Sequence, residues 1–417
     1  MRQIADLHIH SKYSRACSKE LTPGHLDAWA RIKGISILGS SDFTHPAWLK
    51  ELKQSLVPDK PGLLKLKGSD GKVKFMLSTE LSCIYTQGGQ ARRVHHCVFA
   101  PDFTTVDKII AALEGRGCNL RADGRPILGL SSIELAKIVF DAHPDSMIIP
   151  AHAWTPWFAI FGSKSGFDTI QECFGEFTKE IFAIETGLSS DPAMNWRLSQ
   201  LDNITQISNS DAHSLPNLGR EGNAIDIEES NVSYAEVRRI LKEKDKKKFL
   251  YTIEFFPEEG KYHCDGHRDC NVVLTPAESK KLDKRCPKCK KPLTIGVLHR
   301  VDDLADRPVG FKPDTIPFKS IVPLQEIIAE ALDVGKQSKK VQALYHAMVQ
   351  KGESEFSILL DASAAELASL APPEIVAGIL NVRAGSVEVQ PGYDGVYGVV
   401  KAFGKQGIQK PKQSSLL

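Results

Sequence analysis

The sequence predicts an α/β fold for about the first 235 residues, then a small cysteine-containing module and a mainly helical C-terminal region. Three observations predict this arrangement. Short apolar runs of strand length alternate with helical patterns in the first part, which is typical of a mostly parallel sheet. Nearly every such run is followed at once by His, Asp or Glu, as at the strand ends of a barrel. Four of the nine cysteines lie between residues 264 and 289.

The predicted elements of the first part are short, and their boundaries give the expected organisation of the chain. We expect strands at Ile4–Leu7, Ile35–Leu38, Val73–Leu77, Met147–Pro150, Ile181–Ile184 and Ile204–Ser208, and helices at His25–Ile32 and Ser132–Ala142. Four prolines from Pro308 to Pro323 mark a linker, after which helical periodicity returns. The expected units are residues 1–240, a module at 250–300, a helical domain at 301–403 and a flexible tail at 404–417.

The distribution of charged residues and of cysteines in the sequence indicates which partners the protein binds and in which cell compartment it is found. The formal net charge is only +2, but residues 238–248 and 280–291 are two lysine-rich runs. Concentrated positive charge favours a polyanion such as DNA, with a solvated lysine face as the alternative interpretation. No run of about 18 apolar residues is present, which predicts no membrane partner. Five cysteines are scattered singly, as expected of a reducing compartment, so we expect a cytoplasmic protein.

Histidine and carboxylate side chains recur at the predicted strand ends. His8 and His10 are two residues apart, so on an extended chain they point the same way. Each further motif alone could be a structural histidine or a helix cap. Together they predict a shared metal site, because imidazole and carboxylate are the ligands of zinc and manganese. The further motifs are Ser41–His45, Thr79–Leu81, His95–Phe99, Ala151–Ala153, Glu185–Thr186 and Ser210–His213.

The order of these motifs resembles the signature of the polymerase and histidinol phosphatase (PHP) superfamily. The resemblance implies a distorted (β/α)7 barrel that binds two or three divalent metals and hydrolyses phosphoesters. It implies a ligand set of His8, His10, Glu80, His152, Asp211 and His213, completed by His95 or His96. We favour His96, because the apolar strand run begins directly after it.

The chain departs from that signature in two places. Asp42 is followed by Phe43 where many members have histidine, so His45 is the candidate to act beside Asp42 as a ligand. The acidic residue often found after the first motif is replaced by Ser14-Arg15, which leaves a third metal open. Arg15 and Arg220 are instead candidates to hold a phosphate.

The predicted chemistry follows from the ligands. Two cations about 3.5–4 Å apart activate a water molecule and stabilise charge on the phosphate, so no Ser or Cys nucleophile is needed. The resemblance implies Asp211, Glu80 and His213 as catalytic residues, with Glu80 as the bridge between metals. The metals are expected to be Zn²⁺, Mn²⁺ or Mg²⁺.

The cysteine module contains a C-P-x-C sequence at Cys286–Cys289, a feature of zinc ribbons. His267 and Cys270 have the usual spacing for the other half of the site, with Cys264 as a substitute ligand. We predict one structural Zn²⁺ held by His267, Cys270, Cys286 and Cys289, because four protein ligands leave no open position. Unliganded thiols are the alternative.

Longer segments resemble one narrower family, endonuclease Q, over nearly the whole chain. They include Gly39–Pro46, Glu185–Pro192, Ser208–Ser214, Tyr262–Cys270 and Pro391–Gly395. The resemblance implies a DNA repair endonuclease that nicks 5′ to hypoxanthine, uracil, xanthine or an abasic site. Such an enzyme flips the damaged nucleotide into a pocket. The implied partner is double-stranded DNA with a damaged base, and single-stranded DNA stays open.

Several further residues are candidates for contacts with DNA or with a partner protein. Lys246, Lys247 and Lys248 are predicted to bind DNA. Trp154, Trp157 and Phe158 could line the base pocket or equally belong to the core. The final residues, with Gln413, Leu416 and Leu417, are similar to the short peptide that docks on bacterial sliding clamps, and clamp binding is kept as a hypothesis.

Two rival functions share the predicted metal site. A small-molecule phosphatase resembling histidinol phosphatase ranks second, because it has little use for a zinc module and lysine runs. A non-catalytic scaffold that only binds DNA or a polymerase ranks third, because the ligand set is intact. Salt dependence separates the first rival from a nuclease, since only the nuclease is expected to lose affinity steeply with ionic strength.

Overall fold

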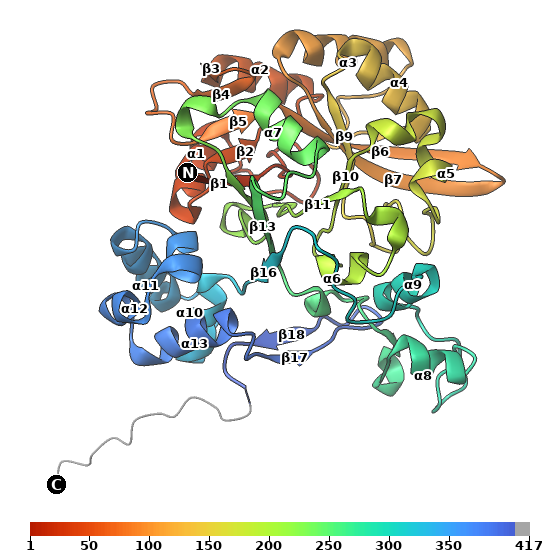
Figure 1. Cartoon of the computed structure of the whole chain (residues 1–417), viewed down its shortest axis with the longest axis vertical. Coiled ribbons are helices and arrows are strands. Elements are labelled where there is room, and N and C mark those ends of the chain that lie inside the picture. Colours follow the sequence, from red (N-terminus) through yellow and green to blue (C-terminus); the bar gives the residue numbers. More distant parts are fainter. Residues whose placement is uncertain (405–417) are drawn as a thin grey trace.

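The protein, described in a computed structural model over residues 1–404, has a mixed α/β fold built around a large sheet (Figure 1). This sheet has eight strands in the order β16-β13-β12-β1-β2-β5-β4-β3. Its strands are β1 (Arg2–Asp6), β2 (Ile37–Gly39), β3 (Leu56–Lys60), β4 (Leu63–Leu66), β5 (Lys74–Met76), β12 (Gly222–Asp226), β13 (Phe249–Glu254) and β16 (Phe318–Ser320).

Two smaller sheets complete the first part of the chain. One has the order β8-β6-β7-β9, with β6 (Ser78–Gln87), β7 (Gln90–Phe99), β8 (Ile127–Leu128) and β9 (Met147–Pro150). The other pairs β10 (Ala183–Glu185) with β11 (Thr205–Ile207) in parallel. The predicted strand Met147–Pro150 is confirmed in both bounds, and the other predicted strands shift by one to two residues.

The expectation of a mostly parallel sheet is wrong, because the sheets are mixed. β1, β2 and β5 are parallel, but β1 and β12, β6 and β7, and β7 and β9 are antiparallel. The long β6–β7 hairpin shows the reason for one of these antiparallel pairs. Gly88 and Gly89 both have positive φ and connect the two strands directly, and so short a turn can join only antiparallel strands.

The helices of the first part begin and end at residues that the sequence supplies for this purpose. Helix α1 starts at Pro23 after the Thr22 cap and ends at Gly34, whose φ is +88°. Helix α4 starts with a capping box formed by Ser131 and Glu134. The helices are α1 (Pro23–Lys33), α2 (Pro46–Ser55), α3 (Phe103–Gly115), α4 (Ser132–Ala142), α5 (Ile170–Phe174), α6 (Pro192–Asn195) and α7 (Tyr234–Lys242).

The cysteine module follows β13 and has a very small apolar core, formed by Val272, Cys286 and Leu293. A core of this size contributes little free energy to folding, so the module needs a further source of stability. Its elements and the helix after it are β14 (Asp265–His267), β15 (Val272–Leu274), α8 (Pro276–Lys281) and α9 (Val297–Leu304).

The C-terminal region consists of α10 (Leu324–Leu332), α11 (Lys339–Lys351), α12 (Ala364–Leu370), α13 (Pro373–Arg383), β17 (Glu388–Gln390) and β18 (Val399–Lys401). Two of its contacts with the first part are the strand β16 and a buried ion pair. β16 joins the large sheet beside β13. Lys33 of α1 forms a buried ion pair of 2.6 Å with Glu355, which also accepts a hydrogen bond from Tyr345.

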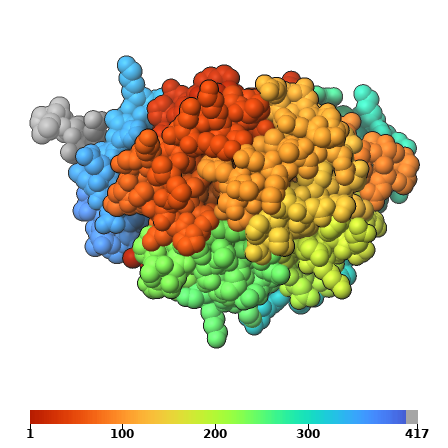
Figure 2. All heavy atoms as spheres, turned by 90° about the horizontal axis from the view of Figure 1, so that it is seen from above, coloured from red at the N-terminus to blue at the C-terminus, as the bar shows by residue number. Residues whose placement is uncertain are grey.

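Short turns of 3-10 helix connect many of these elements, at Gly175–Glu180, Ser199–Leu201, Leu215–Asn217, Glu229–Asn231, Pro257–Glu259 and Arg268–Cys270, with a π-helical turn at Ser357–Asp361. Seen from above, the first part of the chain forms most of the visible face, with the C-terminal helices at one side (Figure 2). Among the helices of residues 1–404, none is long and apolar enough to span a bilayer.

Candidate metal centre

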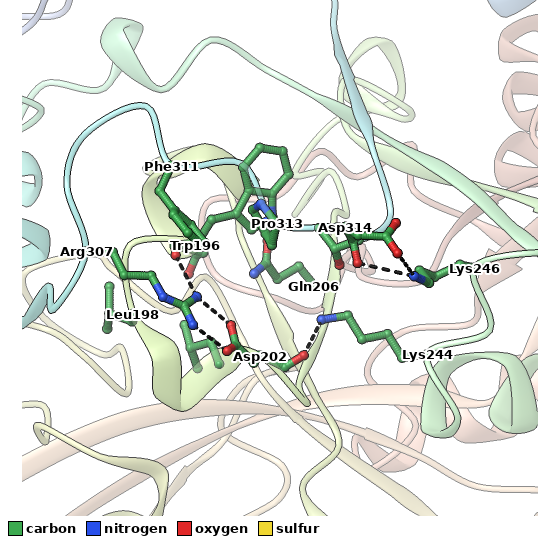
Figure 3. A pocket seen from close by; sticks show the side chains of 13 residues that line it. Trp196, Leu198, Asp202, Gln206, Lys244, Lys246, Arg307, Phe311, Pro313 and Asp314 are labelled. Carbon is green, nitrogen blue, oxygen red and sulfur yellow. Dashed lines mark hydrogen bonds and ion pairs between the residues drawn. The ribbon is translucent and has the colours of Figure 1, made fainter.

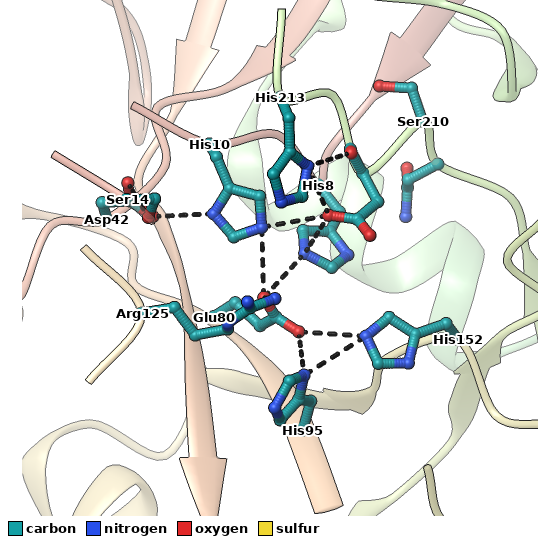
Figure 4. A network of polar contacts seen from close by, with 12 residues as sticks. His8, His10, Ser14, Asp42, Glu80, His95, Arg125, His152, Ser210 and His213 are labelled. Atoms are coloured by element: carbon teal, nitrogen blue, oxygen red, sulfur yellow. Dashed lines mark hydrogen bonds and ion pairs between the residues drawn. The ribbon is translucent and has the colours of Figure 1, made fainter. Parts of the chain in front are cut away.

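Six side chains from five strands, or from the residues that follow them, converge in the first part of the chain (Figure 4). They are His8 and His10 after β1, Glu80 on β6, His95 on β7, His152 after β9 and Asp211 after β11. Their ligand atoms form two groups, each with atoms within 4.8 Å of one another, and Glu80 belongs to both.

The first group consists of His8, His10, Glu80 and Asp211. Nε2 of His10 lies 3.0 Å from Oδ1 of Asp211 and 3.2 Å from Oε2 of Glu80. Nevertheless, among residues 1–404, Nε2 of His8, Nε2 of His10 and Oδ1 of Asp211 are buried without a well-aligned hydrogen-bond partner. Buried polar atoms that converge without bonding one another are satisfied by a divalent cation. The donor atoms of this group therefore fit a metal.

Electrostatics in this group also favours a cation. Burial by itself would lower the pKa of His10, but Asp211, Asp42 and Glu80 outweigh burial and raise that pKa well above its ordinary value. Burial likewise opposes ionisation of Asp211, and contacts with His10 and His8 nevertheless lower its pKa. The carboxylates thus stay ionised and attract positive charge to this point.

The second group consists of Glu80, His95 and His152. Oε1 of Glu80 lies 2.7 Å from Nδ1 of His95 and 3.1 Å from Nε2 of His152. These two nitrogen atoms are 3.3 Å apart. Glu80 thus directs Oε2 to the first group and Oε1 to the second. This is the position that was predicted for a bridging ligand.

The choice of His96 over His95 is corrected by the register of the β6–β7 hairpin. His95 lies opposite Ser82, two residues from Glu80, so both point to the same face. His96 points to the other face, where its Nε2 lies 2.8 Å from Oγ of Ser132. Burial lowers the pKa of His96 to about 3, as expected of a neutral core histidine. The start of an apolar run does not indicate which face a strand residue occupies.

Asp42 also takes a different place from the ligand role that was predicted. Its Oδ2 accepts hydrogen bonds from the amide and hydroxyl of Ser11 and from the hydroxyl of Ser14, at 2.6–2.8 Å. Its Oδ1 lies 3.3 Å from Nδ1 of His10, on the side of the ring away from the cluster. Asp42 therefore orients His10 instead of joining either group.

His45 is outside both groups, which corrects the expectation that it serves as a ligand. Its ring stacks on the ring of Tyr13, with the ring centroids 4.5 Å apart, and His45 is the residue directly before helix α2. His213 lies beside the first group, with its ring 4.6 Å from that of His10. Nδ1 of His213 lies 2.8 Å from the carbonyl oxygen of Asp211. If Nδ1 carries the proton and donates to that carbonyl, Nε2 keeps a lone pair for a metal or a proton.

Glu185 was noted at a strand end but not included in the ligand set, and the structure gives it an orienting place. Both of its oxygens lie 3.0–3.1 Å from Nδ1 of His8. It also accepts hydrogen bonds from the amide of His152 and the side chain of Asn209. A carboxylate on the far nitrogen of an imidazole fixes the ring and raises its basicity as a ligand.

Three residues at these strand ends have strained backbone conformations. Asp211, His152 and Asp42 have φ of +46°, +32° and +40°, a region that non-glycine residues rarely adopt. Each such residue costs about 1–3 kcal/mol, and strain of this kind clusters at functional sites. The turn through positive φ directs these side chains inward immediately after the strand ends.

One residue of the cluster gave no signal in the sequence. Arg125 lies in the loop before β8, and its Nη1 is 3.0 Å from Oε2 of Glu80. The pKa of Arg125 is raised, mainly by the charge of Glu80. Its neighbours Gly124 and Pro126 show no periodicity, and only the folded chain brings this loop to the histidines.

Some of the residues predicted to contact DNA are exposed, and others form contacts within the protein. Arg15 is exposed, and Arg220 donates hydrogen bonds to the backbone carbonyls of Ser210 and Asp211. Lys246 lies beside a separate cavity of about 400 Å³, where it pairs with Asp314 (Figure 3). Lys248 lies 3.9 Å from Asp226, and Lys247 is exposed. Gln413, Leu416 and Leu417 lie outside the described residues.

The structure brings together the four residues predicted for a structural zinc. The ligand atoms of His267, Cys270, Cys286 and Cys289 all lie within 4.8 Å of one another. Cys264 is buried elsewhere, and its amide donates to the carbonyl of Gly392. The donor set of one imidazole and three thiols suits Zn²⁺.

A second feature lies next to the metal centre, a cavity of about 630 Å³ lined by Trp157, Phe158, Tyr262 and Tyr397. Phe158 connects it to the cluster, because its ring is 4.7 Å from that of His95. Trp157 is 39% exposed and meets Tyr262 edge to face. Trp154, in contrast, is fully buried and donates to Asn195, so it belongs to the core.

Comparison with known proteins gives a family model, relatives and solved structures that match part or nearly all of this chain. The family model of the MJ0043 C-terminal domain matches residues 323–386. The uncharacterized protein MJ0043 of Methanocaldococcus jannaschii is 31% identical over 261 residues, which are 62% of this chain; the chain spans only 32% of that relative.

Two solved structures match along nearly their whole length. The crystal structure of the lesion-specific endonuclease PfuEndoQ from Pyrococcus furiosus has a TM-score of 0.85 and 31% identity, covering 96% of this chain and 95% of that one. Endonuclease Q in complex with a 27-mer duplex substrate with an abasic lesion at the active site has a TM-score of 0.84 and 31% identity, covering 98% and 99%. A shared fold and this identity over the full length show that the chain belongs to the endonuclease Q family.

Proposed function

We propose that the protein is a metal-dependent DNA repair endonuclease that hydrolyses the phosphodiester 5′ to a deaminated base or an abasic site. The observation that supports this proposal most is the pair of ligand groups joined by Glu80, which lies beside an open aromatic cavity. The family relationship adds the DNA substrate, because one solved relative holds a duplex with an abasic lesion at its active site.

The proposed roles follow from the geometry. His8, His10, Glu80 and Asp211 hold one cation, and Glu80, His95 and His152 hold another. When bound, two divalent cations supply an activated water and neutralise charge on the phosphate. Glu185 and Asp42 fix the imidazoles of His8 and His10. His213 is placed to accept or return a proton through its free nitrogen.

The rest of the architecture is assigned on the same basis. We infer that the three sheets of the first part form the distorted PHP barrel, with its strand ends gathered around Glu80. His267, Cys270, Cys286 and Cys289 hold a structural Zn²⁺, which stabilises a module whose own core is small. Residues 301–403 act as a separate helical unit that is anchored through β16.

The aromatic cavity is the proposed pocket for the damaged nucleotide. Its volume of about 630 Å³ suits a nucleoside, and Trp157 and Tyr262 offer ring faces on which a base can stack. Nδ1 of His152 lies 3.4 Å from Oγ1 of Thr155 at the edge of the same cavity. A nucleotide in the cavity would therefore place a phosphate beside the ligand groups.

Replacing Trp157 by Ala is expected to weaken binding of lesion-bearing duplex. Stacking of one base on an aromatic ring contributes about 1–3 kcal/mol, which corresponds to roughly 5- to 150-fold in Kd. Fluorescence anisotropy with Ca²⁺ in place of a catalytic metal measures this affinity without cleavage.

The matched control is Phe311→Ala, which removes an aromatic ring from the separate cavity around Lys246. It should bind lesion DNA like the wild type. Equal affinities of the Trp157→Ala variant and the wild type would remove the assignment of the aromatic cavity as the base pocket, while leaving the nuclease assignment in place.

The proposed function is tested with oligonucleotide duplexes that carry one deoxyinosine, deoxyuridine or abasic site, supplied with Mn²⁺ or Mg²⁺. The wild type should produce a single nick on the 5′ side of the lesion, and Asp211→Ala should produce none. Equal cutting of undamaged duplex would reject lesion specificity. Hydrolysis of small phosphate monoesters without any nick would favour a small-molecule phosphatase.

A further inference from the structure

The carboxylate of Asp42, beside His10, forms its hydrogen bonds within the protein. Oδ2 of Asp42 accepts three hydrogen bonds from Ser11 and Ser14, and Oδ1 faces Nδ1 of His10. Asp42 is completely buried, so it has no free lone pair on the substrate side. Among the described residues, Glu80 belongs to two groups that could hold a metal ion, and Asp42 belongs to none.

A loop lies directly against this region and is fixed there by close packing. A side chain at Gly124 would place a carbon 2.3 Å from both Oδ2 of Asp42 and Oγ of Ser14, so only glycine fits. The amide of Gly124 donates to the carbonyl of Tyr13, and the amide of Arg125 donates to Asp123. The backbone on both sides of Arg125 is thereby fixed next to His10.

The guanidinium of Arg125 reaches from this loop into the metal cluster (Figure 4). Its Nη1 lies 3.0 Å from Oε2 of Glu80, the carboxylate that both groups share. The side chain of Arg125 is 26% exposed, whereas that of Glu80 is fully buried. A guanidinium has five N–H donors, so contact with Glu80 leaves others for a ligand on the open side.

We propose that Arg125 is a catalytic residue that donates hydrogen bonds to a non-bridging oxygen of the scissile phosphate, in the place of a third cation. This inference rests on the proposed nuclease function and deepens it. During hydrolysis the water molecule gives up one proton, which His213 is placed to accept, and its oxygen forms the new bond to phosphorus. The bond to the leaving deoxyribose oxygen breaks, and that oxygen takes up one proton in return. Arg125 keeps its protons throughout and stabilises the charge that gathers on the phosphate oxygens.

The test compares Arg125→Ala and Arg125→Lys with the wild type in single-turnover cleavage of a duplex with one abasic site. Arg125→Ala should be slower by about 10²- to 10³-fold, the usual loss for one preorganised donor in the transition state. Arg125→Lys should recover only part of the rate, because an ammonium lacks the planar pair of donors. Added methylguanidinium should restore part of the rate of Arg125→Ala.

Two measurements besides cleavage separate this role from a structural one. The metal content of Arg125→Ala, measured by mass spectrometry, should equal that of the wild type. About tenfold more inorganic phosphate should be needed to raise the melting temperature of Arg125→Ala as much as that of the wild type. The matched control is Arg116→Ala at the exposed end of α3, which should match the wild type in all assays.

The possible failures are distinguishable. An unchanged cleavage rate in Arg125→Ala overturns the proposal, as does loss of metal without rescue by methylguanidinium, which would make Arg125 a positioning residue for Glu80. Failure of the wild type to nick any lesion refutes the proposed function instead. In that case the phosphate measurement still decides whether Arg125 binds a phosphate group.

Discussion

Glu80→Gln is expected to reduce cleavage of lesion-bearing DNA by at least about 10³-fold, because the change affects both ligand groups at once. An amide in place of the carboxylate removes one negative charge and one strong ligand oxygen from the point that they share. Metal stabilisation of transition-state charge is worth several kcal/mol, and each 1.36 kcal/mol changes the rate tenfold. Single-turnover cleavage of an abasic-site duplex measures the loss.

The same variant should also lose bound catalytic metal, measured by mass spectrometry after dialysis, while its affinity for DNA in Ca²⁺-free buffer stays near that of the wild type. The matched control is Glu51→Gln, which changes a carboxylate that pairs with Lys12 outside the cluster. A Glu80→Gln variant that cuts at the wild-type rate would contradict the proposed bridging role.

Cys286→Ser is expected to release the structural zinc and to unfold the cysteine module. Cys286 is fully buried and belongs both to the four-residue ligand cluster and to the small apolar core. Zinc bound to a site of this kind contributes about 10–16 kcal/mol in small zinc modules, far more than so small a core provides. Limited proteolysis should therefore cut the variant between residues 261 and 296, where the wild type resists.

The control for this experiment is Cys264→Ser, since Cys264 is also a buried cysteine of the module but lies outside the ligand cluster. It should keep zinc and resist the protease. Retention of zinc by Cys286→Ser together with loss of zinc by Cys264→Ser would show that the ligand set is wrong. Both results are independent of nuclease activity.

Much of the metal centre could be predicted from local sequence. The alternation of apolar runs and polar endings located the strand-end motifs, because a strand end is recognisable locally. The resemblance to the PHP superfamily then singled out His8, His10, Glu80, His152 and Asp211 among them as ligands. In the cysteine cluster, the spacing alone pointed to His267 and Cys270. The polar residues of these motifs supply the chemistry, and the order of the motifs along the chain gives the family resemblance.

The errors arose where a decision depends on register or on packing. His95 and His96 are adjacent, and only the pairing of β6 with β7 determines which of them faces Glu80. Asp42 and His45 have the residue types of ligands. However, Asp42 accepts hydrogen bonds from Ser11 and Ser14, and the ring of His45 stacks on Tyr13. The mixed direction of the sheets depends on how distant strands pair, as β1 does with β12, and apolar patterns do not encode that pairing.

The sequence by itself determined which residue types could bind metal and roughly where strands would present them, since these properties depend on neighbours within a few positions. The tertiary structure alone decided which side chains meet. Arg125 reaches Glu80 because Gly124 lets its loop approach Asp42, a contact between residues 82 positions apart in the chain. Contacts of that kind depend on how distant segments pack, and no local pattern records them.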